Sequence, residues 1–285
     1  IWVSKFPNIV ENDRAYSLAM KLPKNYITFD AALAACRKKG NGWHLNQTGI
    51  FAVLNLLSQK MGTVPHGNTN YGKDYYHAYE HGIQPQGETQ RTLTGSGEPT
   101  WYHNHDTSGI ADLNGNVWEW TGGLRLMNGE IQIIPYGNSM KIDCDMSAAS
   151  TLWKAIMPNG NLVEPGTAGT LKIDRTSASD ATPKISTTVT TQTTDSNDTN
   201  CIFKNLAAAS GVSIPKLLIA LGLFPDSGAS YGNDHFWARN NGERLPIRGS
   251  AFNGTSDSGA SALSLHNPRS HSSGNIGFRS AFCEL

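Results

Sequence analysis

Apolar residues recur at helical spacing in two segments near the start of the chain. Segment 29–39 carries one apolar face and is followed by Gly40, and segment 50–61 carries another and is followed by Gly62. A glycine directly after such a pattern is typical of a helix end. We therefore predict helices at Phe29–Lys39 and Ile50–Met61. Their apolar faces consist of Phe29, Ala32, Leu33 and Cys36 in the first helix and of Phe51, Leu54, Leu56 and Leu57 in the second.

Alternation of apolar and polar positions predicts strands in the middle of the chain. Residues Asp112–Thr121 contain an Asn-Gly turn followed by an alternating run, and Leu124–Pro135 predicts a hairpin around a second Asn-Gly pair. Trp118 and Trp120 lie in the first of these strands, and we expect both rings in the core. Shorter strands are expected at Trp2–Val3 and Tyr26–Thr28.

Strand-like alternation also continues to the end of the chain, within a very polar stretch. Residues 250–275 contain eight Ser, three Asn, three Gly and two His, with only two charged residues. Leu263 and Leu265, and later Ile276 and Phe278, alternate with small polar residues as in half-buried strands. This pattern indicates a rigid scaffold that presents small polar side chains to solvent.

The segment Thr176–Asn200 has a different composition, with 13 Ser or Thr among its 25 residues. It is either a flexible linker or a polar, exposed hairpin. Because it has few aliphatic side chains to offset the entropy of ordering, we expect the fold to tolerate its deletion. Leu206–Leu223 then predicts one short helix. Residues 156–225 therefore form a predicted insertion between residues 1–155 and 226–285, which together make one domain.

Charge and cysteine content exclude several classes of function. The 285 residues include 23 basic and 23 acidic side chains, and the sequence pI is about 7.3. Nucleic acids and anionic membrane surfaces both favour proteins with a basic excess, so neither is expected as a partner. No apolar run approaches the roughly 20 residues of a membrane-spanning helix. Four widely spaced cysteines without a C-x-x-C pair indicate neither a disulfide scaffold nor a zinc finger.

Two motifs resemble the formylglycine-generating-enzyme branch of the C-type lectin fold. Asp112–Trp120 (DLNGNVWEW) is similar to the DLxGNVWEW signature of that branch, and Arg248-Gly249 with Gly277-Phe278-Arg279 is similar to the ends of its last strands. Gly42–Leu45 (GWHL) stands where the branch turns into a helix. The resemblance implies an α+β fold of the C-type lectin type, here interrupted by the Ser/Thr-rich insertion.

A narrower resemblance extends over nearly the whole chain. The segments 65–75 (PHGNTNYGKDY), 100–106 (TWYHNHD), 165–172 (PGTAGTLK) and 239–249 (RNNGERLPIRG) look like the variable proteins of diversity-generating retroelements. The segment 253–259 (NGTSDSG) is similar to the variable region of the phage tropism determinant, a receptor binder at the tail-fibre tip. In this family an error-prone reverse transcriptase randomises adenine-containing codons, chiefly Asn codons, near the C-terminus.

Compared with the Asn-rich pattern of that variable region, this chain has other residues at seven positions, all reachable from an Asn codon by changes at adenines. These are Gly254, Asp257, Ser264, His266, His271, Ser273 and Gly274. The resemblance implies that the ligand-binding residues comprise these seven together with Asn233, Asp234, His235, Asn240, Asn241 and Asn253. Small Ser, Gly and Asn side chains with scattered His supply adaptable hydrogen bonds, as in antibody paratopes. The chain departs from the family pattern where Ser250-Ala251-Phe252 replaces Gly-Ser-Trp.

The resemblance implies recognition of a protein or glycan ligand on a host or neighbouring cell, from a phage tail tip or a bacterial surface. No nucleic acid partner, membrane insertion, cofactor, metal site or catalytic residue is expected, while a structural calcium and a homo-oligomer stay open.

Two alternatives also stay open: an enzyme of the formylglycine-generating or sulfoxide-synthase type, and a structural virion or surface protein. The oxidase needs a cysteine pair in its final segment. Cys201 and Cys283 are the only C-terminal cysteines here, and none lies between Arg248 and Arg279. We therefore expect no enzymatic activity.

Two further patterns are weaker candidates. Glu98-Pro99-Thr100 comes closest to the EPN loop of calcium-dependent sugar binders, but Thr replaces Asn and no WND follows, so we reject such a site. His103-Asn-His-Asp106 has metal-like spacing within the glycine- and aromatic-rich loop 63–110, but it lacks a clear third ligand. We expect these His and Asp side chains, together with Asp112 and Glu119, to hydrogen-bond the loop backbone.

Overall fold

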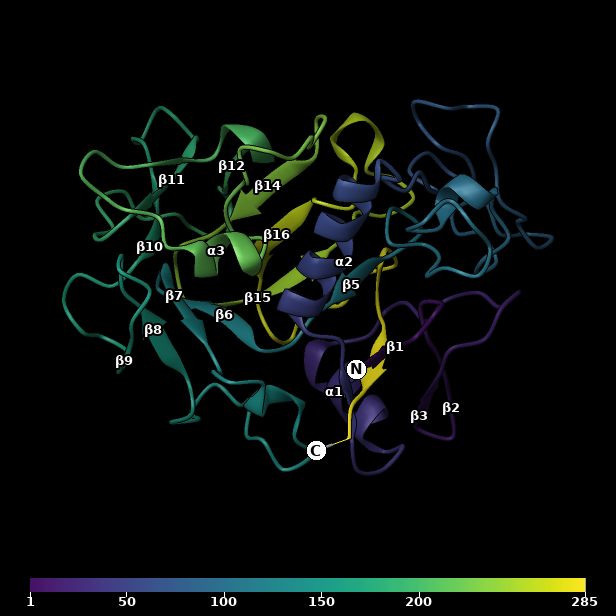
Figure 1. Cartoon of the computed structure of the whole chain (residues 1–285), viewed down its shortest axis with the longest axis horizontal. Coiled ribbons are helices and arrows are strands. Elements are labelled where there is room, and N and C mark those ends of the chain that lie inside the picture. The colour runs from purple at the N-terminus through teal and green to yellow at the C-terminus, as the bar shows by residue number, and fades with distance from the viewer. Residues whose placement is uncertain (285) are drawn as a thin grey trace.

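The computed structural model describes residues 1–284, which form three α-helices and eighteen strands in a mixed α+β arrangement rich in sheet (Figure 1). The helices are α1 (Phe29–Arg37), α2 (Thr48–Met61) and the short α3 (Lys216–Ala220). All three were predicted from the sequence. The hydroxyl of Thr28 caps α1 by accepting a hydrogen bond from the Ala31 N–H at 3.3 Å, and α2 ends at Gly62, whose φ of 71° is left-handed.

The buried face of α2 differs from the predicted one. Leu57 is 41% exposed, whereas the polar residues Asn55 and Ser58 are buried. Each of these polar side chains has a partner outside the helix, since Asn55 Nδ2 donates to Ser261 Oγ at 2.7 Å and Ser58 Oγ donates to the His103 carbonyl at 2.8 Å. Of the predicted face, Phe51 is fully buried and Leu54 and Leu56 are half-buried, so the prediction is wrong only for Leu57. It missed Asn55 and Ser58, whose hydrogen bonds permit their burial.

A small sheet joins the two ends of the chain. Its order is β1 (Trp2–Val3), β18 (Ser280–Phe282) and β4 (Trp43–Leu45), and a separate hairpin pairs β2 (Ile9–Glu11) with β3 (Arg14–Tyr16). The strand predicted at Trp2–Val3 is confirmed. The strand predicted at Tyr26–Thr28 is wrong, because Tyr26 has a φ of 48° and Thr28 serves as the helix cap.

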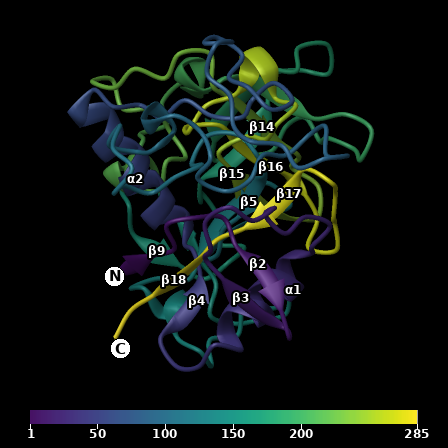
Figure 2. The same cartoon turned by 90° about the vertical axis from the view of Figure 1, so that its right-hand side faces the viewer.

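The large sheet extends in two directions from β15 (Glu243–Arg248). On one side lie β16 (Leu263–Asn267), β14 (His235–Ala238) and β12 (Thr199–Ile202). On the other side lie β6 (Leu124–Met127), β7 (Glu130–Ile133), β10 (Lys172–Arg175), β11 (Pro183–Ser186) and β13 (Ala207–Ala208). Branching from this path are β5 (Trp118–Trp120), β17 (Ile276–Phe278), β8 (Lys154–Ile156) and β9 (Leu162–Val163). Figure 2 shows β14, β15, β16, β5 and β17 gathered in one region of the molecule.

The predicted insertion contributes to this large sheet. The Ser/Thr-rich segment Thr176–Asn200 contains β11 and the first part of β12, and Ile185 in β11 is completely buried. Asp174 accepts hydrogen bonds from Thr190 and Thr191, which hold the polar turn against β10. The flexible-linker alternative is therefore wrong, because strand pairing and these side-chain bonds order the segment. The boundaries of the insertion stay a prediction.

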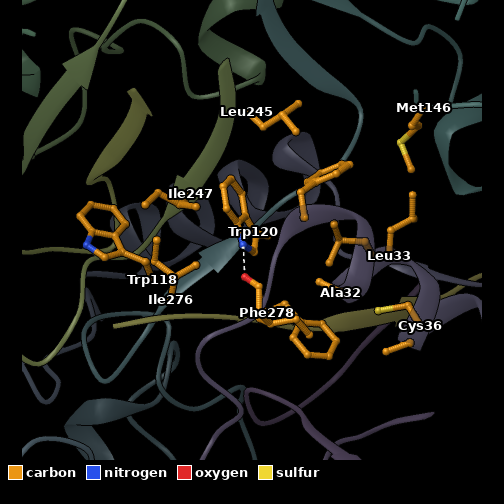
Figure 3. Close-up of a cluster of buried hydrophobic side chains, with 14 of the residues drawn as sticks. Ala32, Leu33, Cys36, Trp118, Trp120, Met146, Leu245, Ile247, Ile276 and Phe278 are labelled. Carbon is orange, nitrogen blue, oxygen red and sulfur yellow. Dashed lines mark hydrogen bonds between the residues drawn. The ribbon is translucent and has the colours of Figure 1, made fainter. Parts of the chain in front are cut away.

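Two clusters of buried side chains stabilise the fold. The first lies among α1, β5, β15 and β17 and includes Phe29, Trp120 and Phe278 (Figure 3). Trp120 is fully buried, and its indole N–H donates to the Ile27 carbonyl at 3.0 Å. The second cluster lies under β6, β7, β14 and β16 and extends to α3. Residues of the predicted insertion thus pack in the same core as β16 from the C-terminal part.

The two family-like motifs meet at a buried ion pair. β5 and β17 pair in parallel, and the Arg279 guanidinium lies 2.7 Å from Glu119 with both side chains at most 1% exposed. Arg279 also donates to backbone carbonyls of residues 4, 5, 111 and 112. Glu119 was expected to bond loop backbone, so that expectation is wrong, whereas Asp112 does accept from the Gly95 N–H at 2.9 Å. This pair fixes the C-terminal strands against the N-terminal part.

Candidate functional site

The C-terminal residues form a pocket of about 450 Å³, which we call the C-terminal pocket. Strands β5, β14, β15, β16 and β17 supply its apolar part and several polar groups, and the loops 250–258 and 268–275 contribute the other lining residues. Its lining residues are Trp118, Trp237, Ile247, Asn253, Gly254, Thr255, Asp257, Ser264, His266, Asn267, His271, Ser273, Asn275 and Ile276.

Two tryptophans and two isoleucines form the apolar part of the pocket. Trp118 and Trp237 meet edge to face, with ring centroids 5.7 Å apart and planes at 84°. Ile247 and Ile276 lie beside Trp118, as Figure 3 shows. Trp118 is buried, as predicted, but it also borders the pocket. Edge-to-face packing of this kind holds aromatic rings in fixed positions and so preorganises a binding surface.

Seven of the thirteen predicted ligand-binding residues line this pocket. They come from three separate stretches of sequence and comprise Asn253, Gly254, Asp257, Ser264, His266, His271 and Ser273. Ser264 was expected to face solvent, but it is only 2% exposed because β16 lies between β14 and β15. The remaining six residues of this group are exposed or half-buried.

Three buried polar atoms at the pocket have no hydrogen-bond partner within residues 1–284. These atoms are Ser264 Oγ, His266 Nδ1 and Asn267 Nδ2. Asp198 lies 3.7 Å from His266 Nδ1, which is too long for a hydrogen bond. A ligand or ordered water at the pocket can supply the missing partners of these three atoms, as water can for other such atoms elsewhere in residues 1–284.

The pocket lining contains one acidic residue and no Lys or Arg. Burial lowers the pKa of His266 to about 4, so its imidazole is uncharged at neutral pH. Burial, followed by the nearby Arg239 guanidinium, also lowers the pKa of His271. Asp257 is the one acidic lining residue, and its carboxylate lies 3.6 Å from His235 Nδ1 at the pocket edge. The arrangement therefore suits a neutral polar or amphipathic ligand that combines an apolar face with hydrogen-bonding groups.

Buried contacts hold the loop that carries Asn253 and Asp257 in place. Ser250 has a φ of 65°, and its buried hydroxyl lies 2.7 Å from Ser258 Oγ, which closes the base of the loop. Phe252 packs against Tyr71, with ring centroids 5.6 Å apart. The Ser-Ala-Phe sequence that departs from the family pattern is thus part of the buried support of the pocket.

Six of the predicted ligand-binding residues do not line the pocket. Asn233 and His235 lie near its edge: Asn233 Nδ2 donates to the Tyr76 hydroxyl at 2.9 Å, and the His235 ring lies 5.3 Å from Trp237. Gly274 packs near the hydroxyl of Tyr26.

The other three are used in intramolecular hydrogen bonds. Asp234 is buried and accepts from the Ser261 N–H at 2.8 Å, and Asn240 is fully buried and accepts from the Thr193 N–H at 2.6 Å. Asn241 donates to Asp195 at 3.2 Å. The side chains of Asp234 and Asn240 therefore support the fold and are not accessible to a ligand.

Five lining residues escaped the sequence analysis, namely Trp237, Ile247, Thr255, Asn267 and Asn275. Trp237 could have been found, because it lies two residues after the predicted His235, on the same face of a short strand. Thr255 and Asn275 lie directly beside predicted residues. Asn267 gives no local signal, since only the strand order brings it to the pocket.

The weaker candidates have structural roles. His103 Nδ1 accepts from the Ile110 N–H at 2.9 Å, His105 Nε2 bonds the Val64 carbonyl at 3.1 Å, and Asp106 accepts from the Ser108 N–H at 2.7 Å. The expectation that these groups bond loop backbone is confirmed. Pro99–Trp101, within the EPN-like segment, forms a short 3-10 turn.

The four cysteines are free thiols in the described part of the chain. Cys36, Cys144 and Cys283 are buried, and burial raises the pKa of the half-buried Cys201 to about 12. A thiol with a raised pKa carries little thiolate at neutral pH and is a poor nucleophile or metal ligand.

Comparisons with known proteins give no family: no protein-family model matches the chain, and no curated protein matches it. Among residues 1–284, no helix combines the length and apolar character needed to cross a bilayer. The functional argument therefore rests on the geometry of the C-terminal pocket.

Proposed function

We propose that the protein binds a ligand through the C-terminal pocket, on a C-type-lectin-type scaffold whose pocket side chains are the diversified positions. One observation carries this proposal. Six of the seven residues chosen from the sequence because they replace Asn in a variable-region pattern converge from segments 254–257, 264–266 and 271–273 on one pocket. Concave sites are few per protein, so an equal number of residues scattered over the surface would not be expected to line the same one.

Features of the fold support the C-type-lectin part of the proposal. The small sheet β1–β18–β4 joins the two chain ends, and the WEW strand β5 lies between β15 and β17, which carry Arg248 and Gly277-Phe278 of the second motif. Helices α1 and α2 flank β4 in sequence, as the Gly42–Leu45 motif implies. The buried Arg279–Glu119 pair ties these motifs together.

The chemistry of the pocket supports binding of a protein or glycan surface. The Trp118–Trp237 pair offers an aromatic face, and amide, hydroxyl and imidazole groups surround it. Rigid aromatic anchors with adaptable small polar groups are the combination that antibody paratopes use. Balanced overall charge disfavours nucleic acid as the partner. By resemblance, we propose that the ligand lies on a host or neighbouring cell and that the protein is displayed on a phage tail tip or a bacterial surface.

Aromatic substitution in the pocket tests this proposal. The labelled protein is titrated on intact bacterial cells and on an array of bacterial surface glycans, alongside His271→Tyr and the control His81→Tyr. His81 is exposed and lies outside the pocket. We expect His271→Tyr to change which cells or glycans are bound, and His81→Tyr to bind as the unmodified protein does. Identical binding by all three proteins would remove the pocket as the ligand site.

A structural virion or surface protein is the second candidate, because unsatisfied pocket groups can also hold ordered water. That function predicts no saturable binding to any cell or glycan by the unmodified chain.

A further inference from the structure

A second chemically distinctive cluster lies outside the C-terminal pocket, in the loop 66–80. His66, His77 and Glu80 each offer a ligand atom, and these atoms lie within 4.8 Å of one another. Among residues 1–284 this is the one group of three such side chains. In the sequence, neither the spacing of these three residues nor the residues around them indicated a metal site.

The two imidazole rings are arranged face to face. The centroids of His66 and His77 lie 3.8 Å apart, and the ring planes differ by only 7°. Each ring also contacts a buried carboxylate through Nδ1: His66 lies 3.0 Å from Glu80, and His77 lies 3.1 Å from Asp74. The Asp74 carboxylate orients the His77 ring through Nδ1 and leaves Nε2 of that ring free, which is the usual arrangement of a metal-binding histidine.

The separations are compatible with a bound metal ion. Two ligand atoms at about 2.1 Å from a tetrahedral metal lie about 3.4 Å from each other. The 3.0 Å separation of His66 Nδ1 and Glu80 is close to this value, so an ion can replace the proton that these two groups share. The His77 ring is parallel to the His66 ring, so it must turn out of this stack for one ion to lie in the plane of both rings. The His77 side chain is 38% exposed, which leaves room for that rotation.

Hydrogen bonds from two neighbouring side chains hold the Glu80 carboxylate in place. Trp101 Nε1 donates to this carboxylate at 3.0 Å and Thr100 Oγ1 at 2.8 Å. The carboxylate therefore keeps a fixed position whether or not an ion is present.

We propose that His66, His77 and Glu80 bind a zinc-like divalent transition metal, with a fourth position open to water. Two imidazoles and one carboxylate suit zinc and its neighbours, whereas calcium and magnesium prefer sets of oxygen ligands. A simple ion pair of His66 and Glu80 would not account for the second imidazole beside it, or for the separate carboxylate of Asp74 that contacts this second ring.

The metal would hold the loop that contacts the rim of the C-terminal pocket. Asp74 Oδ1 accepts hydrogen bonds from the N–H groups of both Tyr76 and His77. The Tyr76 hydroxyl donates to the Ser256 carbonyl at 3.0 Å, next to the lining residues Thr255 and Asp257. Binding at His77 thus fixes Tyr76, and through it the pocket loop.

Calorimetric titration of the tag-free protein with Zn²⁺ tests the site directly. We expect one zinc per chain and a loss of at least tenfold in affinity for His77→Ala, a half-exposed position where truncation leaves the fold intact. His81→Ala is the matched control, since His81 is exposed in the same region and its Nδ1 lies near the Tyr79 carbonyl. The control should bind zinc as the unmodified protein does, and Ca²⁺ and Mg²⁺ should give no saturable heat.

Two further readouts separate binding from folding. Zn²⁺ should raise the Tm of the unmodified chain and of His81→Ala but not that of His77→Ala. Co²⁺ should give the visible absorption of a tetrahedral site in the first two proteins only. The proposal is overturned if the unmodified chain binds no zinc at one equivalent, or if His77→Ala binds it equally well. It is also overturned if His81→Ala loses as much affinity. Ligand binding by the C-terminal pocket is measured separately, so either hypothesis can fail alone.

Discussion

At the scale of single residues, the strongest constraint is the buried pair of Arg279 and Glu119. The Arg279 side chain is fully buried, and its guanidinium bonds one carboxylate and four backbone carbonyls. The sequence identifies both residues as parts of motifs, but a motif does not tell which side chain meets which. Removal of one partner leaves an uncompensated charge in the core, and that is far more costly than the loss of a surface ion pair.

We therefore expect Glu119→Gln to lower the free energy of unfolding by about 3–5 kcal/mol. Glu164→Gln is the control, because Glu164 is 75% exposed and pairs with Lys154 at the surface. An exposed pair contributes about 0–1 kcal/mol, so this variant should unfold almost as the unmodified protein does. Urea denaturation of the three proteins measures both effects, and equal destabilisation by the two substitutions would contradict the role given to Arg279.

Asp234 makes stability depend on pH. Burial raises the pKa of Asp234 to about 7, whereas an exposed Asp titrates near 4. The folded state thus holds this proton more tightly, so the contribution is complete below about pH 4 and is lost as the pH rises through about 7. Asp234→Asn cannot ionise and keeps the acceptor for the Ser261 N–H.

Relative to Asp234→Asn, the unmodified protein should therefore lose stability between about pH 4 and about pH 8. Urea denaturation of both proteins across this range gives the difference in free energy of unfolding, in which groups with the opposite effect, such as His266, cancel. A difference that does not change with pH would show that Asp234 ionises normally in the folded chain.

At the scale of elements, helices and strands with a regular apolar pattern were predicted correctly, whereas segments without such a pattern were not. Both long helices, α3, the WEW strand and the hairpin β6–β7 follow from periodicity and Asn-Gly turns, and these are local signals. The Ser/Thr-rich segment is not a flexible linker, because its strand β11 pairs with β10 and β13, which lie outside the segment. β10 is unremarkable in composition, and β13 is distant from β11 in sequence. Nothing within the segment itself reports these partners.

The segment Thr176–Asn200 should therefore be needed for stability, contrary to the expectation from its composition. Ile185→Ala in β11 should cost about 2–5 kcal/mol, because Ile185 is completely buried in the second core cluster. Thr188→Ala, at an exposed position of the same segment, should change the free energy of unfolding by no more than about 0.5 kcal/mol. Thermal melting of both variants checks this, and a tolerated Ile185→Ala would restore the dispensable-insertion hypothesis.

At the scale of the whole molecule, the pocket results from convergence of distant segments. Its polar lining was largely predicted, since seven of the predicted residues line it, because alternation along β16 and the variable-region pattern both act over short distances. Its aromatic part was only half foreseen: Trp118 was assigned to the core, and Trp237 reaches the pocket through the parallel pairing of β14 with β16. The His66–His77–Glu80 cluster was missed, because it depends on a loop without regular structure.

A pair of matched display libraries tests the central claim, that the pocket side chains decide what is bound without deciding whether the chain folds. One library randomises Asp257, His266, His271 and Ser273, and the other randomises four exposed residues of α2, namely Val53, Leu57, Lys60 and Met61, none of which lines the pocket. Both are selected against the same immobilised proteins and glycans. We predict that folded members are equally frequent in the two libraries and that specific binders emerge only from the pocket library. Binders from both libraries alike, or collapse of folding in the pocket library, would contradict the account.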